Sequence, residues 1–162
     1  MPVLHRGDLV VWDSLAISEY VNETFLDGRG WPVDANERAV ARAISAEMHS
    51  GFQTLRNELP LNCRRRARNF VVSPDARRDI ERITRIWREC RAHAGEGAYL
   101  FGAFSIVDAM YAPVVHRFRT YAIEVTPETQ AYMDTMMAMP AFQQWTRDGL
   151  AETLVIEKFE NV

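Results

Sequence analysis

The strongest hydrophobic pattern in the chain lies between residues 101 and 118, and it predicts a buried central helix. Apolar side chains leave hardly any polar face there until His116, Arg117 and Arg119. A helix that is apolar nearly all round belongs inside a core, so we expect the other elements to wrap around it. The side chains that define the pattern are Val107, Met110, Tyr111, Val114, Val115 and Phe118.

Ser105 and Asp108 mark the start of this helix. Their spacing is that of a capping box, in which the hydroxyl accepts from an early backbone N–H and the carboxylate reaches back to the N-terminal donors. Capping accounts for both side chains, so we assign them a structural role and predict that the helix begins at Ser105. Pro113 lies inside the same pattern. A proline there removes a backbone hydrogen bond at a cost of roughly 3 kcal/mol, so we expect a kink in the helix.

Helical spacing of apolar residues continues through most of the remaining chain. It predicts one long helix over residues 36–58, which ends before a proline. Ser73-Pro74 caps the next helix, whose apolar positions alternate spacings of four and three. After the central helix, Thr126-Pro127 begins another helix, Pro140 interrupts the pattern, and a last amphipathic stretch follows.

The N-terminal stretch has a different pattern. Val3-Leu4-His5 and Leu9-Val10-Val11-Trp12 have the composition of two short strands, and Gly7 supplies the turn of a β-hairpin. Asp13-Ser14 then caps a helix, and the Gly/Pro segment from Gly28 to Pro32 follows it. A lone hairpin is marginal in water, and no other stretch has the pattern of a strand that could pair with it.

These patterns predict a mainly α fold, in which a β-hairpin and one helix precede a bundle of helices. We divide the chain into an N-terminal unit of residues 1–27 and a linker of residues 28–35. An all-helical domain of residues 36–153 and a tail of residues 154–162 follow.

Composition narrows the possible partners. Hydrophobic residues make up 48% of the chain and charged residues 25%, as in ordinary soluble globular domains. The net charge of −3 argues against nucleic acid or an anionic membrane as the main partner, because both require a basic surface. No apolar run approaches the roughly 18 residues that a membrane-spanning helix needs.

Isolated polar motifs suggest little further chemistry. Cys63 and Cys90 do not form a redox pair, and the histidines lack metal-ligand spacing, so we expect a reducing cytoplasmic environment and no metal. Arg64-Arg65-Arg66 and Arg68 have the composition of a nucleic-acid patch. Without interleaved aromatic residues, a solvated loop or a surface for an acidic partner is the better interpretation.

Three motifs carry a resemblance to a known family. Met1-Pro2-Val3-Leu4, Asp13-Ser14-Leu15-Ala16-Ile17 and Ser105-Ile106-Val107-Asp108 occur in the order and spacing found in soluble, cytosolic-type glutathione S-transferases. With its helical remainder, the chain resembles a bacterial member of that family. The resemblance implies a thioredoxin-like domain followed by a helical domain, with glutathione held by the first and an electrophile in the cleft between them.

The resemblance also implies that most of the thioredoxin-like domain is missing from an N-terminally truncated chain. Residues 1–27 are then the remnant of that domain. The Ser, Tyr or Cys that activates the glutathione thiol in this family falls in the missing part, so no catalytic residue is assigned here.

The family motifs assign glutathione binding to Met1, Pro2, Asp13 and Ser14. The resemblance makes Met1-Pro2 a cis bond whose backbone pairs with the peptide of the ligand. A helix N-terminus with Ser14 suits the γ-glutamyl carboxylate, and Asp13 suits the neighbouring ammonium group. Both residues also fit a purely structural role as a helix cap, and that alternative stays open.

An electrophile pocket requires a mostly apolar lining with a few polar groups, which Met48, His49, Phe52 and Tyr111 provide. Met48 and Phe52 also lie on the apolar stripe of the long predicted helix, where core packing is the simpler interpretation.

The function implied by the resemblance is conjugation of glutathione, as co-substrate, to hydrophobic electrophiles by a cytoplasmic homodimer. Such detoxification chemistry requires no metal. The alternative is a non-catalytic helical module for protein interaction or ligand binding.

Overall fold

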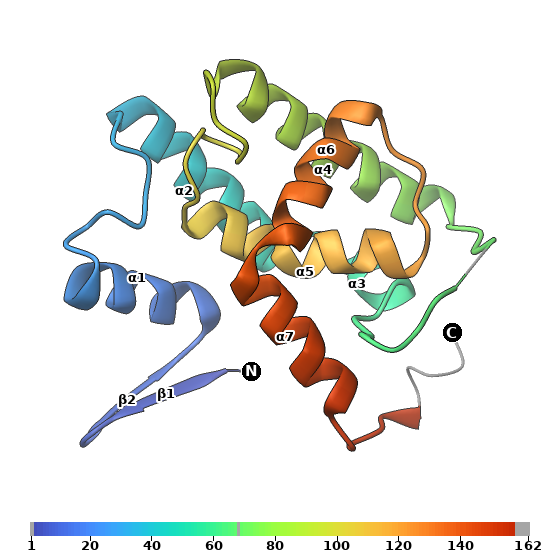
Figure 1. Ribbon diagram of the computed structural model, residues 1–162, viewed down its shortest axis with the longest axis horizontal. Helices are drawn as coiled ribbons and strands as arrows, with labels where there is room; N and C mark the ends of the chain where they lie inside the picture. The colour runs from blue at the N-terminus through green and yellow to red at the C-terminus, as the bar shows by residue number, and fades with distance from the viewer. Residues whose placement is uncertain (1, 68, 158–162) are drawn as a thin grey trace.

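The computed structural model describes residues 2–67 and 69–157, and it confirms the mainly α fold (Figure 1). A two-stranded antiparallel hairpin is followed by seven helices in the described residues. The elements are β1 Val3–Arg6, β2 Leu9–Trp12, α1 Ser14–Phe25, α2 Ala35–Ser50, α3 Gln53–Glu58, α4 Pro74–His93, α5 Ile106–Thr120, α6 Pro127–Ala138 and α7 Pro140–Ala151.

The predicted hairpin is present and stands with α1 at one side of the helical bundle (Figure 1). β1 and β2 pair from Val3 opposite Trp12 to Arg6 opposite Leu9. Gly7 turns the chain at a φ of 58°, a conformation that favours glycine. Trp12 keeps 61% of its surface exposed, so the hairpin contributes little to the core.

The segment between α1 and α2 is packed against the bundle. Gly30 donates its N–H to the Asn22 side chain (2.7 Å), and its carbonyl accepts from Ile106 N–H (2.8 Å). A Cβ on Gly30 would lie 2.7 Å from Asn22 Oδ1 and 2.9 Å from Ile106 Cδ1, so only glycine fits this close approach. Trp31 is buried beside it.

The prediction of one helix over residues 36–58 is wrong. The helix ends at Ser50, and α3 begins at Gln53 after Phe52 has turned the chain at a φ of 57°. The Arg56 side chain of α3 stabilises the break, because it donates to the carbonyls of Gly51 (3.1 Å) and His49 (3.2 Å). These carbonyls would otherwise lack partners at the helix end.

The remaining helix starts follow the predicted caps. Ser73 and Thr126 each accept a backbone N–H at the start of α4 and α6, and Pro74 and Pro127 occupy the first helical positions. Pro140 separates α6 from α7. Proline suits these positions because the first backbone N–H of a helix has no intrahelical partner.

The core surrounds α5, which runs through the middle of the bundle and continues past Pro113 (Figure 1). Trp87 of α4 is its aromatic centre, with ring centroids 5.7 Å from Tyr111, 5.6 Å from Phe118 and 4.9 Å from Tyr132. α4, α5 and α6 therefore meet in one aromatic cluster, and such pairs add about 0.5–1.5 kcal/mol each beyond area burial.

The capping box predicted at the start of α5 is present, and its carboxylate does more than cap. Asp108 is fully buried, and it accepts hydrogen bonds from Ser105 N–H (2.9 Å), Leu100 N–H (3.1 Å) and Tyr132 O–H (3.1 Å). Burial raises the pKa of Asp108, while these donors act in the opposite direction. One side chain thus joins the loop before α5, α5 itself and α6.

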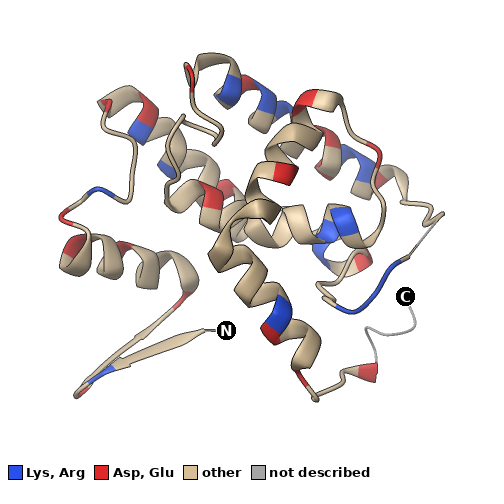
Figure 2. Ribbon diagram, in the orientation of Figure 1, with Lys and Arg blue, Asp and Glu red and all other residues tan. Residues whose placement is uncertain are grey.

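The arginine-rich segment before α4 is partly used inside the molecule. Figure 2 shows basic positions along this loop. Arg64 donates to the carbonyls of Glu152 (2.8 Å) and Leu154 (3.2 Å), and Arg65 lies over the Tyr121 ring. Arg68 is outside the described residues.

The described residues contain neither a membrane-spanning helix nor a cluster of metal ligands. None of their helices combines the length and apolar character needed to cross a bilayer. None of their His, Cys, Asp and Glu side chains gather into a group of three that could hold a metal ion.

Asp108→Asn should lower the free energy of unfolding by about 2–3 kcal/mol, because a buried donor loses its acceptor and a second N–H enters the network. Chemical denaturation with an unchanged slope would measure the loss. Asp75→Asn, in the exposed first turn of α4, is the control and should cost less than about 1 kcal/mol. Equal midpoints for the two variants would contradict the role assigned to Asp108.

His116 provides a prediction about pH. It is fully buried between α5 and α7, with its ring centroid 6.1 Å from that of Phe142 and 5.6 Å from that of Trp145. Thr120 Oγ1 donates to the Asn62 carbonyl, so it accepts from Nδ1–H of His116 (3.3 Å). Nε2 has no partner in the described residues. Burial above all, and then the nearby arginines, lowers the pKa of His116 from 6.5 to about 4.

Between pH 6.5 and 4 the unfolded chain therefore binds a proton at this histidine that the folded chain does not. The stability that neutral His116 contributes is complete above pH 6.5 and is lost as the pH falls toward 4, by on the order of 3 kcal/mol. The free energy of unfolding, measured from pH 6.5 down to pH 4, should fall more steeply for the native chain than for His116→Gln. Parallel curves would show that another group controls the acid transition.

Candidate functional site

The candidate site lies at the turn between β2 and α1, where Asp13 and Ser14 meet. Asp13 has a φ of 81°, which a non-glycine residue adopts only at a cost that the surroundings must offset. Its Oδ1 accepts from Leu15 N–H (2.9 Å) and Ala16 N–H (3.1 Å), so the carboxylate caps α1. The structural role considered for Asp13 is therefore real.

The second oxygen of Asp13 pairs with His49 in the last turn of α2. Asp13 Oδ2 and His49 Nε2 are 2.8 Å apart, and about a third of each side chain is exposed. The pKa of Asp13 is lowered mainly by the Ala16 N–H, with Leu15 and His49 acting in the same direction. A residue predicted to bind glutathione and one predicted to line an electrophile pocket are thus direct neighbours.

Ser14 is the first residue of α1 and is partly exposed. Its backbone carbonyl accepts from Ser18 Oγ (2.8 Å), whereas its own hydroxyl has no partner within the described part of the chain. Because Asp13 already occupies two N–H groups of the first turn, the Ser14 hydroxyl is the side-chain donor that this helix end offers to a ligand.

Pro2 lies close to this turn through the hairpin register. Val3 pairs with Trp12, so Pro2 and Asp13 follow at the open end of the same ladder. Met1 and its bond to Pro2 lie outside the described residues, and so does the cis geometry predicted for that bond.

The other electrophile-pocket candidates are inside the core. Met48 is 2% exposed, Phe52 8% and Tyr111 0%. Tyr111 donates its hydroxyl to the Ile44 carbonyl (3.2 Å), and burial raises its pKa. Each of these three side chains would have to be uncovered before it could contact an electrophile, whereas His49 already reaches solvent.

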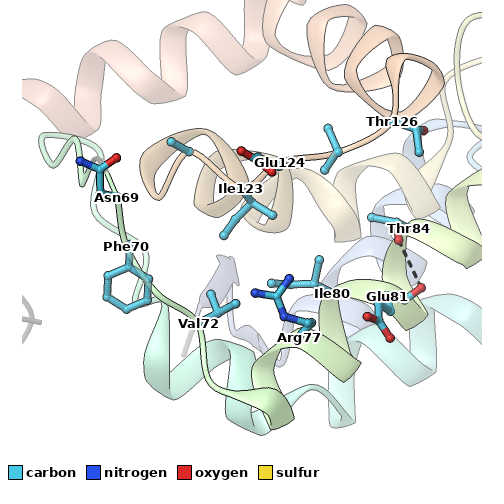
Figure 3. Close-up of a pocket in the computed structure, with 12 residues that line it drawn as sticks. Asn69, Phe70, Val72, Arg77, Ile80, Glu81, Thr84, Ile123, Glu124 and Thr126 are labelled. Atoms are coloured by element: carbon cyan, nitrogen blue, oxygen red, sulfur yellow. Dashed lines mark hydrogen bonds between the residues drawn. The ribbon is translucent and has the colours of Figure 1, made fainter.

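A cavity of about 830 Å³ lies elsewhere, between the start of α4, the loop before it and the loop between α5 and α6. Figure 3 shows Arg77 directed into this space, with Ile80, Ile123 and Phe70 supplying apolar surface. It contains no residue assigned to the site from sequence. Its walls come from segments about fifty positions apart in the sequence. Hydrophobic periodicity reports local helix and strand patterns, so it could not predict this cavity.

Comparison with known proteins agrees with the fold. Residues 73–148 match the family model described as the C-terminal domain of glutathione S-transferase. A probable maleylacetoacetate isomerase of Caenorhabditis elegans is 30% identical over 145 residues, covering 82% of this chain and 63% of the relative. Maleylacetoacetate isomerase of Rattus norvegicus is 29% identical over 147 residues, covering 88% and 66%. The chain therefore spans less than two thirds of the length of these two relatives.

Solved structures share the architecture at low identity. A glutathione transferase homolog from Burkholderia with bound glutathione has a TM-score of 0.69 at 22% identity, covering 94% of this chain and 74% of that one. Maleylpyruvate isomerase from Pseudomonas aeruginosa has a TM-score of 0.61 at 20% identity, covering 89% and 78%. Likeness at this level shows the fold. Together with the match over residues 73–148, it supports a glutathione S-transferase family for this chain.

Proposed function

We propose that this chain belongs to a glutathione-dependent transferase and that it holds the γ-glutamyl end of glutathione at the start of α1. The observation that carries the proposal is the unpartnered Ser14 hydroxyl beside the ionised, partly exposed Asp13 carboxylate. A similar fold from Burkholderia was solved with glutathione bound, which supports glutathione as the ligand.

Each group has a chemical role in the proposal. Ser14 O–H and the positive end of α1 receive the γ-glutamyl carboxylate, since a helix N-terminus favours an anion. Asp13 receives the neighbouring ammonium group through the oxygen that now pairs with His49 (2.8 Å). The backbone at Met1 and Pro2 is proposed to bind the peptide of glutathione.

The proposed reaction is conjugation of the glutathione sulfur to an apolar electrophile in the cytoplasm. The thiolate is the reactive form, and lowering a thiol pKa from about 8.5 needs a donor or positive field at the sulfur. We assign that role to no described residue of this chain. In the electrophile pocket, His49 is the proposed polar contact, and Met48, Phe52 and Tyr111 would form the apolar wall behind it.

Isomerisation of a maleyl compound is a second candidate. The two curated relatives named here are maleylacetoacetate isomerases, one of them probable, which favours this reaction. A non-catalytic binding module is the third candidate function.

The proposal includes the division of the chain. We assign residues 1–27 to a glutathione-binding domain and residues 36–153 to a helical domain.

We also propose that the functional state is a homodimer. The hairpin exposes strand edges and apolar side chains, among them Val3, Leu9 and Trp12, and such edges favour association. Light scattering at micromolar concentration should give twice the chain mass, with or without reductant because Cys63 and Cys90 are free. A monomer mass would remove this part of the proposal.

Glutathione should bind this chain weakly, with a Kd on the order of millimolar, and Ser14→Ala should weaken binding roughly tenfold by removing a hydrogen bond to a carboxylate. His49→Gln should tighten binding up to about fivefold, because the competing, partly exposed contact between Asp13 and His49 is worth on the order of 1 kcal/mol or less. Titration followed by NMR measures both effects.

Ser50→Ala is the control, because this exposed hydroxyl only bonds the Ala46 carbonyl one turn earlier. Undetectable binding to the native chain, or equal loss in Ser14→Ala and Ser50→Ala, would overturn the assignment. Assays with an aromatic halide and with maleylacetoacetate separate transferase from isomerase activity. Turnover of either substrate would exclude the non-catalytic module, whereas binding without turnover fits both the module and a transferase whose thiol-activating residue is not among the described residues.

A further inference from the structure

A second pocket lies between α4 and the first turn of α6, remote from Asp13 in the sequence. Its volume is about 400 Å³, within the usual range of small-molecule sites. α4 supplies Trp87, Arg88 and Arg91, and α6 supplies Glu128 and Thr129. Most of the pocket wall is apolar.

One polar group in its wall lacks a partner. Trp87 is only 1% exposed, and its indole N–H has no acceptor within the described residues. Buried donors are nearly always hydrogen-bonded, because an unmade bond leaves the desolvation cost uncompensated. The same indole packs against Tyr132 of α6 at 4.9 Å, so the surrounding packing limits its movement toward another acceptor.

The charges at the pocket favour an anion. Arg88 is exposed and donates to no described group, and Arg91 uses one guanidinium N–H on the Ala98 carbonyl, which leaves further donors. Glu128 opposes them with one negative charge. Figure 2 shows the basic positions along α4. Glu128 lies in the first turn of α6. The positive end of α6 adds to the two cations.

We propose that this pocket binds a small apolar carboxylate, whose charged end meets Arg88 and Arg91 and whose oxygen accepts from the Trp87 N–H. The apolar body of the ligand then fills the space between α4 and α6. A carboxylate can accept from the buried indole N–H and from both guanidinium groups at once, whereas a neutral apolar molecule offers no acceptor to any of them. The site is separate from the one proposed for glutathione.

The probe is naphthylacetate, and naphthylethanol is its uncharged counterpart. Calorimetric titration of the native chain should show that the acid binds at least tenfold more tightly than the alcohol. In ¹⁵N NMR spectra, the Trp87 indole N–H signal should move downfield on saturation with the acid, with Trp87→Phe identifying the signal. Saturating glutathione should leave the affinity unchanged. Equal affinity for acid and alcohol, an unmoved indole signal or competition by glutathione would each overturn the proposal.

Variants test the charges without touching the core. Arg88→Gln should weaken naphthylacetate roughly tenfold, and Glu128→Gln should tighten it severalfold by removing the opposing charge. Arg77→Gln is the matched control, since Arg77 is an exposed arginine of the same helix that lines the 830 Å³ cavity instead. If Arg88→Gln and Arg77→Gln weakened binding equally, the affinity would depend on overall surface charge and not on this pocket, and the proposed site would be wrong.

Discussion

The buried carboxylate of Asp108 is the constraint on which the helical bundle depends. A charge with no exposed surface is tolerated only where donors surround it, and here they come from Ser105, Leu100 and Tyr132. These residues belong to the start of α5, the loop before it and α6. The position of α6 against α4 is then fixed by the aromatic contacts of Trp87, so one polar interaction aligns the apolar layers.

Sequence patterns predicted most of the helices and the hairpin, because the interactions that begin and end these elements join residues close in sequence. Ser105 with Asp108, Ser73 with Pro74, and Thr126 with Pro127 cap helices through groups within a few residues, so their spacing is enough. The pattern failed between α2 and α3, where Phe52 keeps the apolar periodicity of a helix while its backbone leaves the helix. The stabilising bonds come from Arg56, and no periodicity in apolar positions reports a guanidinium that binds carbonyls.

The candidate site was only partly predictable for the same reason. Asp13 and Ser14 stand out by their position after a strand and before a helix. The contact between Asp13 and His49 joins residues far apart in sequence, and the pocket at Trp87 depends on how α6 crosses α4. The apolar pattern of the central helix predicted the burial of Tyr111, whose hydroxyl donates to the Ile44 carbonyl inside the core. Sequence supplied the residue types, and packing decided which of them face solvent.

The close approach at Gly30 bears on how the candidate site can move. α1 is tied at its first turn by Asp13 to α2, and near its end by Asn22 through Gly30 to the first residue of α5. A ligand that takes Asp13 from His49 releases the tie at the first turn and leaves the one at Asn22 in place. The middle of α1 also stays attached, because Glu19 accepts from the Trp31 indole N–H and lies 3.6 Å from Arg42 of α2. Ligand binding at Asp13 can therefore loosen the start of α1 without detaching the helix.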